Sequence, residues 1–157
     1  MRQKRKMWSY VAITIGVAVT GRLVWMIDDW SRDWSTNHAH LSMTNPDPAL
    51  RPLDVDGDTR TIAERIQNWV DDQTAWQIVL DESAAPPQRL HLTRTTPVFR
   101  FVDDIWVELT PQEVAAGEPP RTRVDAASQS RVGKGDLGQN PRNLKALRAG
   151  ILGEAVR

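Results

Sequence analysis

The sequence of 157 residues contains no cysteine. This absence excludes a disulfide framework, a metal site built from thiolates, a cysteine nucleophile and the acylated cysteine of a lipoprotein. It is compatible with either redox compartment. With 40% hydrophobic and 25% charged residues, the composition is that of a globular chain. The length allows one domain of ordinary size plus an appendage.

The formal net charge of the chain is zero, but the charged residues are unevenly distributed along the sequence. Residues 1–27 contain five basic residues and no acidic one, which gives this segment +5. The remainder holds all 20 acidic residues and 15 of the 20 basic ones, which gives −5. A domain with this balance has no general electrostatic attraction to nucleic acid or anionic lipid. We therefore expect no nucleic-acid partner.

The segment 7–27 has the length and composition of a transmembrane helix. At about 1.5 Å per residue it would span roughly the hydrocarbon thickness of a bilayer. Trp8 and Tyr10 lie near one end and Trp25 near the other, as aromatic rings do at the headgroup level. The basic leader, residues 1–6, predicts a cytoplasmic N-terminus. We expect a single-pass anchor in the inner membrane, with the domain on the extracytoplasmic side.

Two features bear on this anchor. Arg22 lies close enough to the end of the segment for its side chain to reach the interface. Cleavage after Thr20, as in a signal peptide, is the main alternative, but Ala18 alone makes a poor cleavage motif. Residues 28–58 are predicted to form a juxtamembrane stalk, with Trp30 and Trp34 on one helix face, and an irregular connector rich in proline.

Residues 59–153 carry the signals of a folded α+β domain, and residues 154–157 form a tail. Apolar residues spaced i, i+4, i+7 and i+8 from Ile62 predict a helix that ends near Asp72. Thr61 and Glu64 have the spacing of a capping box, and Asp58 or Thr59 is the alternative cap. Four strands follow, over 76–80, 89–95, 99–109 and 122–131. The strand 99–109 would place Phe99, Phe101 and Asp103 on its apolar face, so that either Asp103 is a buried carboxylate with a partner or Asp103 and Asp104 mark a bulge or turn. The core of this strand is expected at 105–109 because Pro97 weakens its start.

Asn140 as the N-cap, Pro141 at the first helical position and Gly153 at the end predict a final helix. The expected fold is therefore α+β, in the order α-β-β-β-β-α. The N-terminal transmembrane helix is followed by a two-layer sandwich, in which helices cover one face of a four-stranded antiparallel sheet.

Three stretches resemble a known family. They are SRDWSTNHAHL (31–41), LTRTTPVFRFVDD (92–104) and RVDAASQSRVGKGDLGQNPRNLKAL (123–147). On these motifs the chain is identified as a member of the bacterial domain-of-unknown-function family 1499. The resemblance covers most of residues 28–150. It implies no activity, cofactor or catalytic residue, but members of that family often follow one or more membrane segments.

The loop 131–140 is the best candidate for a ligand site. Its three glycines permit backbone shapes that expose N–H groups, and the positive end of a helix dipole follows. With Arg131 and Lys134 nearby, an anion or phosphate could bind, and Asn140 lies at the helix start. In the alternative, the loop is a tight turn in which Asp136 accepts from loop amides or pairs with Arg131. The spacing fits neither a P-loop nor a dinucleotide fingerprint.

A second constellation could form from charged residues of the strands, namely Arg94, Arg100, Asp103, Asp104 and Arg131. An inward-facing Asp103 must be paired or protonated, and a buried ion pair that fixes strand register is favoured over acid–base chemistry. Asp103 and Asp104 cannot form a glycosidase dyad, because adjacent strand residues point to opposite faces.

Metal and cofactor signals are weak. His38 and His40 lie two residues apart and His91 could join them in a zinc site, but structural or solvent-exposed histidines are favoured. Asp54, Asp56 and Asp58 depart from the calcium-loop pattern after the first positions. We expect neither a metal nor a cofactor.

The sequence favours a binding or interaction module of the bacterial cell envelope, with an envelope protein or a small anionic ligand as its partner. The alternative is a hydrolase or other enzyme that acts on an anionic envelope component at the 131–140 loop. No catalytic residue is assigned, and the residues proposed to bind an anion are Arg94, Asp103, Asp104, Arg131, Lys134, Asp136 and Asn140.

Overall fold

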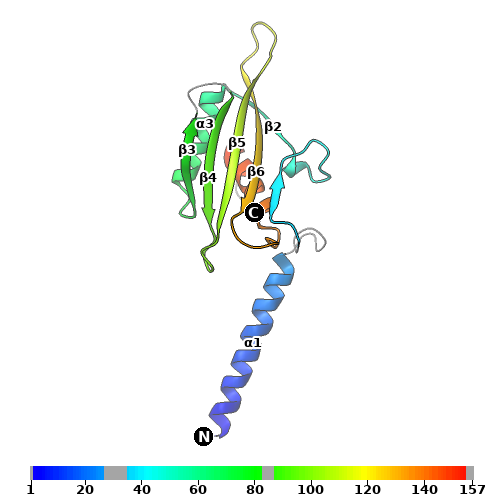
Figure 1. The fold of residues 1–157 in the computed structure, drawn as a ribbon, viewed down its shortest axis with the longest axis vertical. Coiled ribbons are helices and arrows are strands. Elements are labelled where there is room, and N and C mark those ends of the chain that lie inside the picture. Colours follow the sequence, from blue (N-terminus) through cyan, green and yellow to red (C-terminus); the bar gives the residue numbers. More distant parts are fainter. Residues whose placement is uncertain (1, 27–34, 83–86, 155–157) are drawn as a thin grey trace.

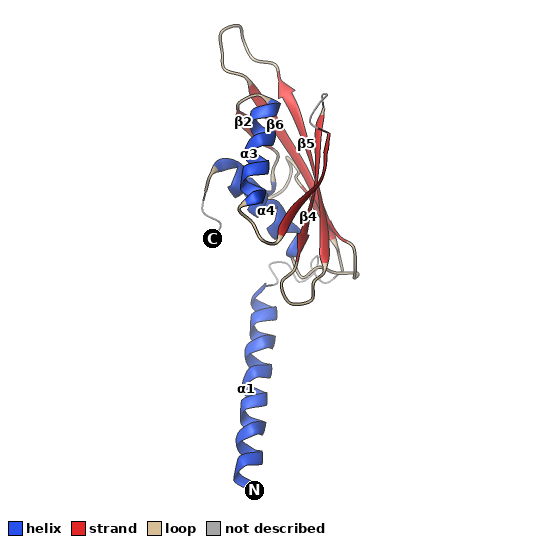
Figure 2. Cartoon of the chain, turned by 90° about the vertical axis from the view of Figure 1, so that its left-hand side faces the viewer, coloured by secondary structure: helices blue, strands red, loops and turns tan. Residues whose placement is uncertain are grey.

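The computed structural model describes residues 2–26, 35–82 and 87–154. The N-terminal helix α1 (Arg2–Met26) extends away from a domain in which helices pack on a sheet (Figure 1). Two further helices, α3 (Thr59–Asp71) and α4 (Gln139–Leu152), cover one face of that sheet (Figure 2). The other face carries no helix in the described part of the chain.

Six antiparallel strands form the sheet within the described residues. Their bounds are β1 (His38–His40), β2 (Leu53–Asp56), β3 (Trp76–Glu82), β4 (Gln88–Thr95), β5 (Val102–Gln112) and β6 (Arg121–Ser130). The strand order is β1-β6-β5-β4-β3, and β2 also pairs with β6. The expected sheet of four strands is therefore wrong.

The two additional strands come from the segment 35–58, which the sequence predicted to be irregular. β1 pairs with residues 127–129 of β6, and β2 pairs with residues 121–124 of the same strand. Strands of three and four residues contain too few alternations to be distinguished from a loop by pattern alone. Their hydrogen bonds to β6, which lies far away in sequence, decide their structure.

The predicted N-terminal transmembrane helix is also corrected. A helix is present, but none in the described residues is both long enough and apolar enough to cross a bilayer. The sequence of α1 shows why, since polar and small residues interrupt its apolar run and four basic residues occupy its first turns. Ile27 and the predicted stalk with Trp30 and Trp34 lie outside the described residues. The extracytoplasmic location of the domain stays a prediction.

The core lies between the sheet and the two covering helices. Alternate residues of β5 face it, namely Asp103, Ile105, Val107 and Leu109. Helix α3 contributes Ile62, Ile66 and Val70 to the core, as the helical periodicity predicted. Asp58 is the N-cap of this helix, and its side chain accepts a hydrogen bond from the Thr61 amide at 2.7 Å. Three residues of α4 complete it: Leu144, Leu147 and Ile151.

The turn between β4 and β5 departs from the sequence prediction. Phe99 and Phe101 were expected on the apolar face of a strand, but β5 begins only at Val102. Both rings are exposed, and they stack on each other with centroids 5.5 Å apart. Pro97 and the positive φ of Arg100 (57°) form a turn where the pattern predicted an extended strand.

Candidate functional site

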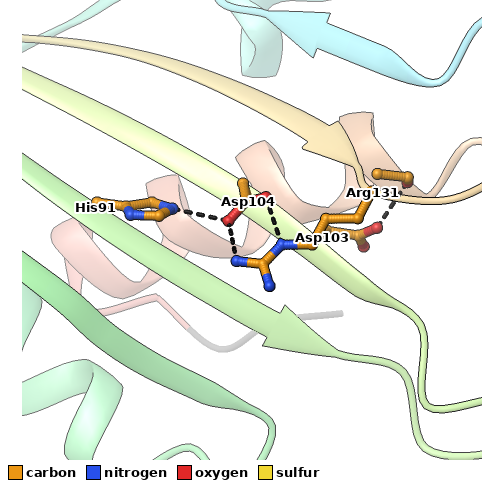
Figure 3. Close-up of polar contacts among 5 residues, drawn as sticks. His91, Asp103, Asp104 and Arg131 are labelled. Atoms are coloured by element: carbon orange, nitrogen blue, oxygen red, sulfur yellow. Dashed lines mark hydrogen bonds and ion pairs between the residues drawn. The ribbon is translucent and has the colours of Figure 1, made fainter.

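Asp103 and Asp104 lie on opposite faces of the sheet, as strand alternation predicted (Figure 3). Asp103 faces α4 and is only 1% exposed, whereas Asp104 faces the side without helices. The Ser130 hydroxyl donates to Oδ1 of Asp103 at 2.6 Å, and the Asn143 side-chain amide donates to Oδ2 at 3.0 Å. Both carboxylate oxygens of Asp103 therefore have partners within the protein.

These bonds belong to a larger buried network between β6 and the start of α4. The Ser128 hydroxyl donates to Oδ1 of Asn140 at 2.6 Å, and Nδ2 of Asn140 donates to the Asn37 carbonyl at 2.7 Å and to Ser130 at 3.1 Å. The predicted role of Asn140 as N-cap is wrong, because Gly138 occupies that position and Asn140 is fully buried. A closed polar network of this kind fixes how α4 sits on the sheet.

Arg94 joins the network from β4. Its Nη1 donates to Oδ1 of Asn143 at 2.6 Å, and its guanidinium lies 5.9 Å from the ring centroid of Trp76. Burial lowers the pKa of Arg94, while the nearby charge of Asp103 acts to raise it. Arg94 and Asp103 are directly opposed on β4 and β5, while the Nη1 hydrogen bond of Arg94 goes to Asn143. The buried ion pair that the sequence favoured stays a prediction.

The glycine-rich loop 131–140 is organised by Asp136. Its Oδ1 accepts from the Gly138 amide at 2.9 Å and its Oδ2 from the Asn140 amide at 2.6 Å. Gly133 and Gly138 have φ angles of 98° and 76°, which glycine adopts without strain. The amides at the start of α4 are therefore already bonded to a carboxylate of the same loop. Lys134 is exposed at its outer side.

Arg131 does not pair with Asp136 but with Asp104 on the open face. Its Nε donates to Oδ2 and its Nη2 to Oδ1, both at 2.7 Å, and His91 Nε2 lies 2.8 Å from Oδ1 (Figure 3). The hydrogen bonds from Arg131 lower the pKa of Asp104, with a smaller contribution from His91, and the same pair raises the pKa of Arg131. The seven predicted residues are thus divided among the buried network, the loop and the open face.

A groove of about 560 Å³ lies on the open face next to this cluster. Trp106 lines this groove, is 45% exposed, and stacks on His91 with an interplanar angle of 7° and centroids 5.5 Å apart. The other lining residues are His40, Leu41, Leu80, Glu82, Arg89, Leu90, Val107, Glu108, Asp125, Ala126 and Ala127. Sequence reasoning did not single out Trp106, although its position between Ile105 and Val107 on an alternating strand puts it on the outer face.

The histidines do not assemble into the zinc site that was considered. His91 contacts Asp104, His40 lines the groove, and His38 lies in β1. Among the described residues, no three histidines, aspartates or glutamates are placed to hold a metal ion together.

The fold and site define a two-layer α+β domain with one uncovered, partly aromatic sheet face. Residues 28–151 match the model of the family described as protein of unknown function (DUF1499), so the chain belongs to that family. The resemblance found in the sequence is confirmed. None of the curated proteins compared with this chain matches it.

Proposed function

We propose that this domain is a binding module and that its open sheet face takes up a cationic side chain of a protein partner. The observation that carries the proposal is the exposed Trp106 ring in a groove that is also lined by three carboxylates. Trp is the ring that attracts cations most strongly and is enriched in the energetic centres of protein interfaces. That this binding occurs in the bacterial cell envelope stays a prediction from the sequence.

The aromatic surface is held in place before any partner arrives. Trp106 and His91 are directly opposed on β5 and β4, and their rings are nearly parallel. The His91 ring contacts the Asp104 carboxylate, and Arg131 donates two hydrogen bonds to that carboxylate. These contacts hold the ring in place. A preformed surface loses little side-chain entropy on binding. It therefore binds more tightly than a mobile surface that makes the same contacts.

The charges around the groove favour a cation. Three carboxylates line it, from Glu82, Glu108 and Asp125, against the single guanidinium of Arg89. Arg89 lies 3.2 Å from Glu108, which leaves the groove net negative when its histidines are neutral. A carboxylate beside an aromatic face is the arrangement that recognises an ammonium or guanidinium group.

A hydrolase at the 131–140 loop has less support. The loop amides that would bind an anionic substrate are bonded to Asp136, and the buried carboxylate of Asp103 is bonded to Ser130 and Asn143. The His91–Asp104 contact has the form of an oriented base. This dyad is the feature to test for an enzyme.

The test is a titration of the full chain with a blocked tri-lysine peptide, followed by NMR. We expect the indole resonance of Trp106 to shift, and Trp106→Ala to weaken binding by about tenfold or more. Tyr10→Ala, which removes an exposed aromatic ring outside the groove, is the matched control and should bind as the parent does.

Two kinds of result, in binding or in catalysis, would overturn the proposal. One is an unchanged Trp106 resonance, or an equal response to a tri-glutamate peptide. The other is hydrolysis of a p-nitrophenyl ester or phosphate by the chain that is lost in His91→Gln, because this would assign the face to catalysis.

A further inference from the structure

The turn between β4 and β5 presents an apolar protrusion at one end of the sheet. We call the set Val98, Phe99, Phe101 and Val132 the apolar tip. Their exposed fractions are 78%, 69%, 46% and 60%, respectively. The chain has only two phenylalanines, and both are in this tip instead of in the core. Apolar side chains gathered on a surface mark sites that contact another protein or a membrane.

The tip combines two segments that are far apart in sequence. The Arg131 amide donates to the Val102 carbonyl at 3.0 Å, which brings Val132 beside the end of the β4–β5 turn. The same loop contacts the chain where the domain begins, because the Asp136 amide donates to the Thr36 carbonyl at 3.3 Å. The tip therefore lies at the end of the domain from which α1 extends (Figures 1 and 2).

The turn is built to hold its rings outward. The Thr96 amide donates to the Phe101 carbonyl at 2.8 Å, and the Arg100 amide donates to the Thr96 carbonyl at 3.1 Å. The Phe101 amide donates to the Thr96 hydroxyl at 2.9 Å. Arg100 adopts a left-handed φ of 57°, a conformation that a non-glycine residue enters at a cost. Three hydrogen bonds to one threonine thus fix an apolar turn that buries nothing in the domain.

The charges beside the tip are locally basic although the domain as a whole is acidic. Arg100 lies within the turn and Lys134 within the adjoining loop. The acidic residues next to the two segments of the tip are engaged internally, since Asp104 binds Arg131, Asp136 binds loop amides and Asp103 is buried. Two exposed acidic residues of this end, Asp71 and Asp72, belong to the end of α3. Basic side chains close to an anionic lipid surface are attracted to it.

We infer that the apolar tip inserts into the surface of an anionic lipid bilayer. A convex protrusion of aromatic and branched side chains fits the interface between headgroups and acyl chains, where aromatic rings prefer to lie. Arg100 and Lys134 would then meet lipid phosphates. This inference concerns a different surface from the groove at Trp106 and does not depend on the proposed function.

Because the chain has no cysteine, one introduced cysteine can report on the tip alone. The full chain with Val98→Cys is labelled with an environment-sensitive fluorophore. The matched control is Ala116→Cys with the same label, in the exposed turn between β5 and β6 at the other end of the sheet (Figure 1). Both are mixed with vesicles of equal parts phosphatidylcholine and phosphatidylglycerol. A second set of vesicles carries a quencher on the acyl chains.

We expect the probe at position 98 to shift to shorter wavelength and to be quenched by the lipid, while the probe at 116 does neither. Adding Phe99→Ser and Phe101→Ser should weaken the vesicle response of a Val132→Cys probe by at least about tenfold, because the loss of one buried phenylalanine side chain is already enough for a change of this size. An unresponsive probe at 98, equal responses at 98 and 116, or equal responses to pure phosphatidylcholine would each overturn the inference. A shift at 98 that grows with protein concentration without vesicles would instead assign the tip to a second copy of the chain.

Discussion

Asp103 and Asp104 are neighbours in sequence, but β5 places them in different environments. The first carboxylate is buried against α4, and the second lies on the open face beside Arg131 and His91. A carboxyl group in a protein interior is tolerated when its oxygens are hydrogen-bonded, and both oxygens of Asp103 accept hydrogen bonds, from Ser130 and Asn143. The two residues therefore allow separate tests of the buried network and of the open face.

Asp103→Ala should destabilise the domain by about 2–4 kcal/mol, because it leaves the buried donors of Ser130 and Asn143 without their acceptor and removes the opposite charge near Arg94. Chemical denaturation measures this loss. Asp125→Ala, on the exposed side of β6, is the control and should change the free energy of unfolding by no more than about 0.5 kcal/mol. Equal effects of the two substitutions would contradict the network described here.

The Asp104–Arg131 pair predicts a particular acid dependence. Folding lowers the pKa of Asp104 below its ordinary value of 3.8, so the unfolded chain takes up the proton more readily. The stability from this pair is complete above pH 3.8 and is lost as the pH falls through the lower folded value. The difference in unfolding free energy between the parent and Asp104→Asn should therefore be largest near neutral pH and should shrink below 3.8.

Arg131→Gln provides the matched test of that assignment. It should flatten the same acid limb of the stability curve, and combining it with Asp104→Asn should add little further change, since both substitutions remove one interaction. Additive effects in the double variant would show that each residue stabilises the domain through other contacts.

At the scale of elements, the packing of α3 against α4 depends on one glycine. A methyl group at Gly150 would lie 2.4 Å from Cδ2 of Trp69, closer than atoms can pack. The Trp69 ring is itself packed edge-on against Trp76, with centroids 4.9 Å apart. The close approach of the two helices therefore requires the absence of a side chain at position 150.

Gly150→Ala should destabilise the domain by about 1–3 kcal/mol in denaturant titrations, although alanine favours a helix by about 1 kcal/mol over glycine. Gly16→Ala, at a position in α1 with open space around it, is the control and should leave the domain transition unchanged. If Gly150→Ala were stabilising, the contact between the helix and the Trp69 ring would be wrong.

At the scale of the whole molecule, α1 and the domain are distinct parts. The figures show α1 extending away from the sheet and from the helices that cover it (Figures 1 and 2). Among the residues whose burial is described, the apolar core is formed by residues from Leu50 to Ile151, and none of these belongs to α1. The domain should thus fold without it.

A shortened chain of residues 35–157 should melt within about 2 °C of the full chain, because a domain of this size shifts by several degrees for each kcal/mol lost. Differential scanning calorimetry of both chains makes the comparison. The control is a chain that begins at residue 59 and so lacks β1 and β2, which should lose most of its stability. A large drop for 35–157 would show that α1 is part of the folded unit.

The sequence by itself determined the elements with strong local signals. Ile62, Ile66 and Val70 repeat with the period of a helix, and the alternation in β4 and β6 marks their two faces. It also separated Asp103 from Asp104 and identified the family, because motifs and residue alternation are properties of the linear chain.

Only the tertiary structure decided which distant residues meet. The partner of Arg131 is Asp104, 27 positions away, although Asp136 lies nearer in sequence. β1 and β2 exist because β6 pairs with them, and Phe99 and Phe101 leave the sheet because Arg100 turns the chain. Such contacts depend on how separate elements pack against one another, which local periodicity does not encode.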